Sequence, residues 1–129
     1  MAIAHDALHQ CRILVTQTSP NHETLARLIQ QHQGVTLCAP VSTVLAKTVS
    51  KSKQLALRQA DTFVFLSSHS VRITAPFLHS ITDPVTYIAI GPSTQAALAS
   101  IDKPHALTPE HYSRQGICTL EHMQNKGQR

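Results

Sequence analysis

The sequence predicts an α/β protein in which helices flank a parallel sheet. Short apolar and β-branched runs alternate along the chain with stretches of helical apolar spacing. Two of these runs, residues 62–66 and 87–90, end in hydroxyl-rich turns that open helices. The chain has 129 residues, 42% of them hydrophobic, which suffices for one ordinary domain or two small ones with a buried core. In such folds ligands bind at the carboxyl ends of the strands.

The first predicted segment is a strand followed by a helix. Residues 12–16 form a short β-branched run typical of a buried strand. Ser19 can cap the helix, Pro20 suits its first turn, and Gly34 is placed to end it. The apolar face of this helix consists of Leu25, Leu28 and Ile29.

A strand over residues 35–39 comes next, and Pro40 interrupts it. We expect the chain to leave one sheet for another over residues 41–44. A weak helix is expected within residues 45–60, where lysine and serine leave its start open. The apolar residues of this helix are Leu55 and Leu57.

The rest of the chain repeats a strand, a polar turn and a helix. Residues 62–66 lead into the turn 67–70, and residues 87–90 lead into the turn 91–94 and a helix over 95–100. The helix after the first turn contains Val71, Ile73 and Leu78.

A short edge strand and a last helix are predicted near the end of the sequence. Residues 106–107 give the edge strand, and Ser113 is a suitable cap for the helix. Gly127 is placed to end that helix. Its apolar positions are Ile117, Leu120 and Met123.

The formal charge of +4 makes an anionic partner plausible, but several partner classes are not supported. The basic residues are scattered, and the loose cluster within 47–58 is typical of a solvated helix face. Aromatic residues make up 4% of the chain and tryptophan is absent, which argues against stacking on single-stranded nucleic acid. We therefore expect no nucleic-acid partner.

The cysteines and the first residues predict a cytoplasmic protein without a membrane partner. Cys11, Cys38 and Cys118 are isolated, which suits a reducing compartment better than a disulfide framework or a zinc site. No apolar run reaches the roughly 18 residues that span a membrane, and residues 1–9 lack the features of a signal peptide.

The two hydroxyl-rich turns are the strongest chemical signal in the sequence. Hydroxyls and free backbone N–H groups at the start of a helix suit carboxylate or phosphate. The residues that supply them are Ser67, Ser68, Ser70, Gly91, Ser93 and Thr94. Ordinary helix capping is an equally common role for any one of them, but two such turns in one sheet favour a polyanionic ligand. His69 can act as a general acid or base, although hydrogen bonding alone is the commoner role.

Other reaction classes lack their motifs. The GxSxG elbow of serine hydrolases, the phosphate-binding loop GxxxxGK[ST] and histidine spacings such as HExxH are all absent from the sequence, and a metal site is not predicted. A flavodoxin-like or response-regulator-like domain is a further alternative. It is disfavoured because no acidic cluster follows the first strand and no aromatic residue is available to stack on a flavin.

The order of segments resembles uroporphyrinogen-III synthase in the form found in gamma-proteobacteria. Residues 12–16 look like that family's opening strand, and Ala-Pro-Val at 39–41 like its first crossover. Phe-Leu-Ser-Ser-His-Ser-Val at 65–71 looks like its serine turn. The helix start Gly-Pro-Ser-Thr within 89–98 and the capped helix at 112–117 complete the resemblance.

The resemblance implies a cofactor-free lyase of haem biosynthesis. The family's enzyme cyclises the linear tetrapyrrole hydroxymethylbilane to uroporphyrinogen III, with loss of water and inversion of the last pyrrole ring. Its two α/β domains hold the substrate carboxylates through backbone amides and hydroxyls. By resemblance, the substrate-binding residues here are Thr16, Ser67, Ser68, His69, Gly91, Ser93, Thr94 and Ser113, and no catalytic residue is assigned.

The resemblance also has departures. The family commonly has Arg-Pro after the first strand, where this chain has Gln17 and Thr18. Only about the N-terminal half of the family's length is covered, so we expect residues 1–43 to form part of one domain and residues 44–129 most of a second. A shortened gene product, one piece of a split enzyme and an excised piece of a longer chain all fit this coverage. A homodimer or a separate C-terminal half would complete the fold. A non-catalytic α/β module that binds anions or partners is the alternative function.

Overall fold

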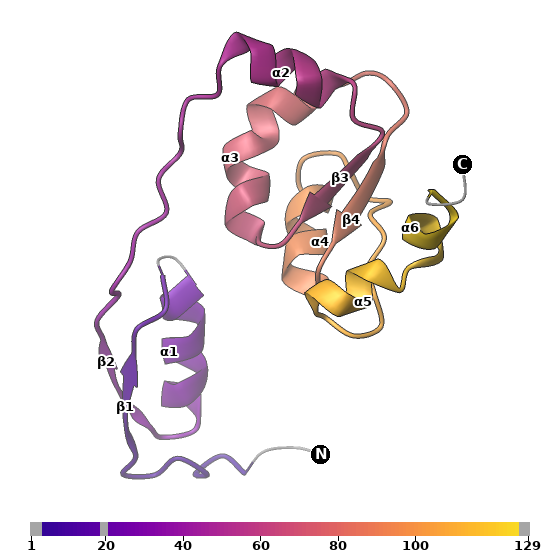
Figure 1. The fold of residues 1–129 in the computed structure, drawn as a ribbon. Coiled ribbons are helices and arrows are strands. Elements are labelled where there is room, and N and C mark those ends of the chain that lie inside the picture. The colour runs from indigo at the N-terminus through magenta and orange to yellow at the C-terminus, as the bar shows by residue number, and fades with distance from the viewer. Residues whose placement is uncertain (1–3, 19–20, 127–129) are drawn as a thin grey trace. The chain divides into compact units, whose positions relative to one another are not determined.

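The computed structural model describes residues 4–18 and 21–126. They fall into two compact units, unit 1 (Met1–Leu45) and unit 2 (Ala46–Arg129), and each is considered by itself. Figure 1 follows the chain through the helices and strands of both units. Three residues with predicted roles lie outside the described part of the chain: Ser19, Pro20 and Gly127.

The described residues of unit 1 form two parallel strands and one helix. The elements are β1 (Arg12–Val15), α1 (Asn21–Gln31) and β2 (Val35–Cys38). The strands pair from Arg12 opposite Val35 to Val15 opposite Cys38. The helix buries Ala26 and Ile29. Leu25 is 40% exposed and Leu28 is 51% exposed, so the predicted apolar face of α1 is buried only in part.

The end of α1 differs from the prediction in the role of Gly34. The left-handed backbone that ends the helix belongs to Gln33, whose φ is 63°. The N–H of Gly34 donates to the carbonyl of Ile29 at 2.9 Å, and that of Gln33 donates to Gln30 at 3.0 Å, as in a Schellman motif. An ideal Cβ on Gly34 would lie 2.5 Å from Cγ2 of Ile29. Glycine is therefore needed here for close packing and not for its backbone freedom.

Unit 2 contains a second pair of parallel strands with helices around it. The elements are α2 (Lys51–Arg58), β3 (Thr62–Phe65), α3 (Ser68–His79), β4 (Thr86–Ala89), α4 (Pro92–Ala99), α5 (Arg114–Cys118) and α6 (Glu121–Lys126). Residues 39–50, which precede α2, form neither helix nor strand. The predicted weak helix is α2, and it buries none of its residues.

The sheet of unit 2 consists of the parallel strands β3 and β4. The strands pair from Thr62 opposite Thr86 to Phe65 opposite Ala89. An isolated parallel bridge pairs Ile88 with Leu107, so Leu107 of the predicted edge strand at 106–107 lies beside β4, although the segment forms no full strand. The strand run from β3 through β4 to Leu107 is therefore parallel throughout, as the sequence predicts.

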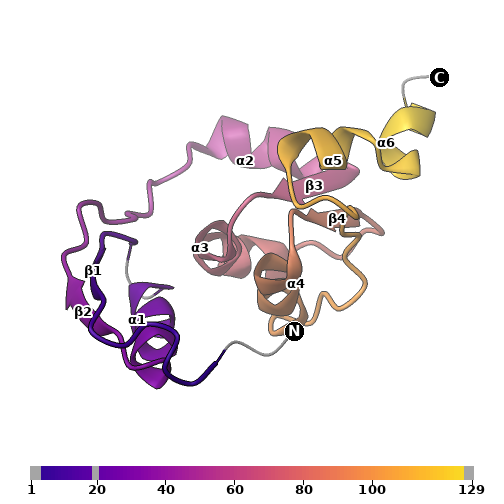
Figure 2. The same ribbon diagram turned by 90° about the horizontal axis from the view of Figure 1, so that it is seen from below.

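The core of unit 2 lies between this sheet and the helices α3 and α4. Because side chains alternate along a strand, Tyr87 and Ala89 face these helices while Ile88 faces the opposite side. The core residues are Phe65, Val71, Leu78, Tyr87, Ala89, Leu98 and Ala106. Helices α5 and α6 lie toward the other face of the strands, as Figure 2 shows. Ile88 is fully buried, and Ile117 of α5 is 5% exposed.

The predicted last helix is two short helices. Ser113 caps α5 as predicted, since its side chain accepts the N–H of Gly116 at 3.0 Å. The helix ends at Thr119, whose hydroxyl donates to the carbonyl of Gly116 at 2.7 Å. This local hydrogen bond competes with helix continuation, and α6 begins two residues later.

Candidate functional site

The turns that follow β3 and β4 lie side by side at one edge of the sheet in unit 2. The carbonyl of Phe65 accepts the N–H of Ile90 at 3.0 Å, which extends the strand pairing to the point where both strands end. Parallel strands end at the same edge, so the starts of α3 and α4 are neighbours (Figure 1). We call these two turns, residues 67–70 and 91–94, the strand-end site.

The first turn caps its own helix. Ser67 is the N-cap of α3, and its hydroxyl accepts the N–H of Ser70 at 3.2 Å. The hydroxyl of Ser70 donates to the carbonyl of Ser67 at 2.7 Å. Ser68 is 6% exposed, and His69 is partly buried. The hydroxyls of Ser67 and Ser70 are thus used to order the turn.

The second turn leaves its helix start open. Gly91 is the N-cap of α4 and no side chain caps the helix. The φ of Gly91 is −167°, which is extended backbone open to any residue. Pro92 has no N–H, so the N–H groups of Ser93 and Thr94 are the free donors of the first turn. Ser93 is exposed, whereas Thr94 is 2% exposed and offers a ligand chiefly its backbone.

The segment that follows the edge strand adds residues to this site that the sequence did not single out. An ideal Cβ on Gly91 would lie 3.4 Å from Cγ of Tyr112, so the tyrosine ring borders the second turn. Tyr112 is 62% exposed. Thr108, directly after the bridge at Leu107, has a buried hydroxyl that finds no hydrogen-bond partner in the described part of the chain. Both residues follow the predicted edge strand at 106–107, and this position was the only feature of the sequence that could have marked them as candidate site residues.

Six of the predicted substrate-binding residues are brought together at the strand-end site. They are Ser67, Ser68, His69, Gly91, Ser93 and Thr94. Ser113 follows Tyr112 in the chain, and its hydroxyl is used as the cap of α5. Thr16 belongs to unit 1, where it is exposed directly after β1.

The donor groups of this site fit an anion better than a metal ion. In the part of the chain that the structure describes, His, Cys, Asp and Glu do not form a group of three placed to hold a metal. Backbone N–H groups and hydroxyls donate hydrogen bonds to carboxylate or phosphate oxygens. Among the helices described, none is both long and apolar enough to span a membrane.

The fold is that of an α/β protein with parallel strands, and the two helix starts of the strand-end site follow the carboxyl ends of β3 and β4. In a comparison with known protein families, the family described as uroporphyrinogen-III synthase HemD matches residues 23–129 of this chain. The curated proteins include no match to the chain. The matched residues are most of the sequence, so the chain belongs to the uroporphyrinogen-III synthase family, an enzyme family of tetrapyrrole biosynthesis. The predicted family and α/β fold are thereby confirmed.

Proposed function

We propose that this chain binds hydroxymethylbilane and promotes its cyclisation to uroporphyrinogen III. The reaction releases water and inverts the last pyrrole ring. Family membership supports the assignment to tetrapyrrole chemistry. The open N-terminus of α4 is the single structural observation that carries the proposal, because it matches the carboxylates of the substrate.

The start of α4 favours a carboxylate for two reasons. The N–H groups of Ser93 and Thr94 point out of the helix without an intrahelical acceptor. The helix dipole places partial positive charge at the same end, and a carboxylate near it is stabilised by about 0.3–1 kcal/mol. The formal charge of +4 on the chain favours the approach of a polycarboxylate as well.

The first turn supplies the neighbouring contacts in this proposal. Ser68 and His69 open α3 directly beside α4, so a substrate with several acetate and propionate groups can engage both helix starts. Thr16 and Ser113 are further candidate contacts. The chemistry then depends mainly on holding the two reacting ends of the bilane together and stabilising the charge that develops.

Carboxylate recognition can be tested separately from turnover. We would titrate the full chain with uroporphyrin III, the oxidised product, and with its fully methyl-esterified form, following backbone amide signals by NMR. We expect saturable shifts at Gly91, Ser93 and Thr94 with the acid alone, weakening as salt is added. Equal shifts with the ester, or shifts confined to residues outside the strand-end site, would remove the basis of the proposal.

A further inference from the structure

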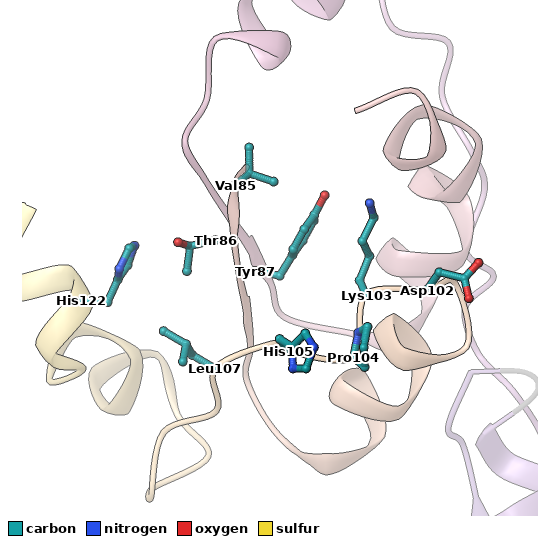
Figure 3. A pocket seen from close by; sticks show the side chains of 9 residues that line it. All are labelled: Val85, Thr86, Tyr87, Asp102, Lys103, Pro104, His105, Leu107 and His122. Atoms are coloured by element: carbon teal, nitrogen blue, oxygen red, sulfur yellow. The ribbon is translucent and has the colours of Figure 1, made fainter. Parts of the chain in front are cut away.

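A pocket of unit 2 lies at the opposite end of β4 from the strand-end site. Its volume is about 410 Å³, within the range of small-molecule sites. The residues that line it are Val85, Thr86, Tyr87, Asp102, Lys103, Pro104, His105, Leu107 and His122 (Figure 3). It shares no residue with the turns 67–70 and 91–94.

The wall formed by Tyr87 holds polar groups without protein partners. Tyr87 is 9% exposed, and its buried hydroxyl has no hydrogen-bond partner among the residues that the structure describes. The carbonyl of Tyr87 and the N–H of Ala89 both bond Leu107 at 2.8 Å, so this edge of β4 faces residues 102–107. The N–H of Tyr87 faces the same edge, and no carbonyl of the described residues accepts it. Of these two donors, the backbone N–H lies at the edge of the sheet, where it can meet an external acceptor.

Basic side chains dominate the rest of the lining. Lys103 Nζ lies 5.5 Å from the centre of the Tyr87 ring, and in Figure 3 the ammonium and the phenol hydroxyl point the same way. His105 and His122 add two imidazoles. Asp102 is the one acidic residue of the lining, and Figure 3 shows its carboxylate directed away from Tyr87 and Lys103.

Hydrogen bonds hold two parts of the lining in place before any ligand arrives. The N–H of Lys103 donates to the carbonyl of Leu98 at 3.0 Å, which fixes the start of the 102–105 loop to the end of α4. On the other side, Nε2 of His122 lies 3.0 Å from the hydroxyl of Thr62 on β3. A loop whose backbone is already held loses little freedom when a ligand binds, which favours affinity.

We propose that this pocket binds a small oxyanion, phosphate or carboxylate, carried on a compact apolar body. Lys103 would pair with the oxyanion, and the unpaired backbone N–H of Tyr87 would donate to it. Val85, Pro104 and Leu107 form the apolar wall for the rest of the ligand. The volume of the pocket exceeds that of a bare phosphate ion, which is why an organic body is part of the proposal.

The chain offers a direct optical readout for this proposal. It contains no tryptophan and two tyrosines, so Tyr112→Phe leaves Tyr87 as the single strong fluorophore. We would titrate this variant with inorganic phosphate, n-butyl phosphate and butyrate, none of which absorbs where tyrosine emits, at constant ionic strength. We expect a saturable change in Tyr87 emission with an organic anion, tighter than with phosphate. The better of butyl phosphate and butyrate identifies the headgroup.

Substitutions of lysine make the test specific. In the Tyr112→Phe background, Lys103→Met removes the charge and keeps most of the stem, and we expect at least about tenfold weaker binding. Lys103→Arg should bind nearly as well. Lys53→Met removes the same charge from α2, outside the pocket, and should leave binding unchanged. Equal weakening by Lys53→Met, full binding by Lys103→Met with native circular dichroism, or no saturation by about 10 mM of any probe would overturn the proposal.

Discussion

The carbonyl of Phe65 accepts the N–H of Ile90 at 3.0 Å, and this one hydrogen bond sets the starts of two helices beside each other. Phe65 is the last residue of β3, and Ile90 directly follows β4. The two chain segments then turn into α3 and α4. The helix starts differ in one respect, because Ser67 caps α3 while no side chain caps α4. A carboxylate ligand would therefore be bound most directly by α4.

Giving α4 a side-chain cap should weaken ligand binding without harming the fold. In Gly91→Ser the new hydroxyl can accept an N–H of the first helical turn and so compete with a ligand carboxylate. We expect affinity for uroporphyrin III to fall about fivefold, equivalent to about 1 kcal/mol. Gly91→Ala is the matched control, since its Cβ meets Tyr112 at an ordinary 3.4 Å and adds no cap. Calorimetry that finds Ser and Ala equally weak would exclude competition by capping.

Removing the cap of α3 should lower stability. Ser67→Ala deletes the hydroxyl that accepts the N–H of Ser70, and the free energy of unfolding should fall by about 1 kcal/mol. Ser93→Ala is the comparison, because that exposed residue does not cap α4, and its effect should stay within about 0.5 kcal/mol. Urea denaturation followed by circular dichroism measures both, and a Ser67→Ala variant as stable as the parent chain would contradict the capping role.

The hydroxyl of Thr94 can be tested at constant volume. Thr94 is 2% exposed, so Thr94→Val preserves the packing of α4 against the core. If the hydroxyl contributes a hydrogen bond to the substrate, binding of uroporphyrin III should weaken by about 1 kcal/mol. Thr82→Val, an exposed change in the same unit, should have no effect on the titration. An unchanged dissociation constant for Thr94→Val would limit this residue to its backbone N–H.

Adjacent residues at the end of α1 should respond in opposite directions. Gln33→Gly relieves a φ of 63° and should stabilise unit 1 by about 0.5–1 kcal/mol. Gly34→Ala places a Cβ 2.5 Å from Cγ2 of Ile29 and should destabilise it, and the cost of Gly34→Ala should be smaller in an Ile29→Ala background, where the clash is gone. Hydrogen exchange of the α1 amides distinguishes the two changes. Stabilisation by Gly34→Ala would mean that the close contact with Ile29 is not present.

The sequence predicted those features that depend on local patterns. The apolar runs at 62–66 and 87–90 become β3 and β4 because each is short, rich in residues that favour strands, and bounded by polar residues. Ser67 and Ser113 cap helices as predicted, since capping needs only a hydroxyl and the next N–H groups.

Features that depend on tertiary contacts were not predictable in the same way. The need for glycine at position 34 comes from the approach of Ile29, while the left-handed turn belongs to Gln33. The last helix divides at Thr119 through a side-chain hydrogen bond that spacing alone does not reveal. At the strand-end site, the two turns follow from sequence, but the position of Tyr112 beside Gly91 depends on how the chain returns after the edge strand.

The most direct test of the proposed function is an isomer assay with the purified 129-residue chain. Freshly made hydroxymethylbilane is supplied, the product is oxidised, and uroporphyrins I and III are separated, with a protein-free reaction giving the spontaneous background. We expect isomer III well above that background, and less of it with Gly91→Ser than with Gly91→Ala. Isomer I alone, even where uroporphyrin III still binds, would contradict the proposed cyclisation and leave the chain as a non-catalytic anion-binding module.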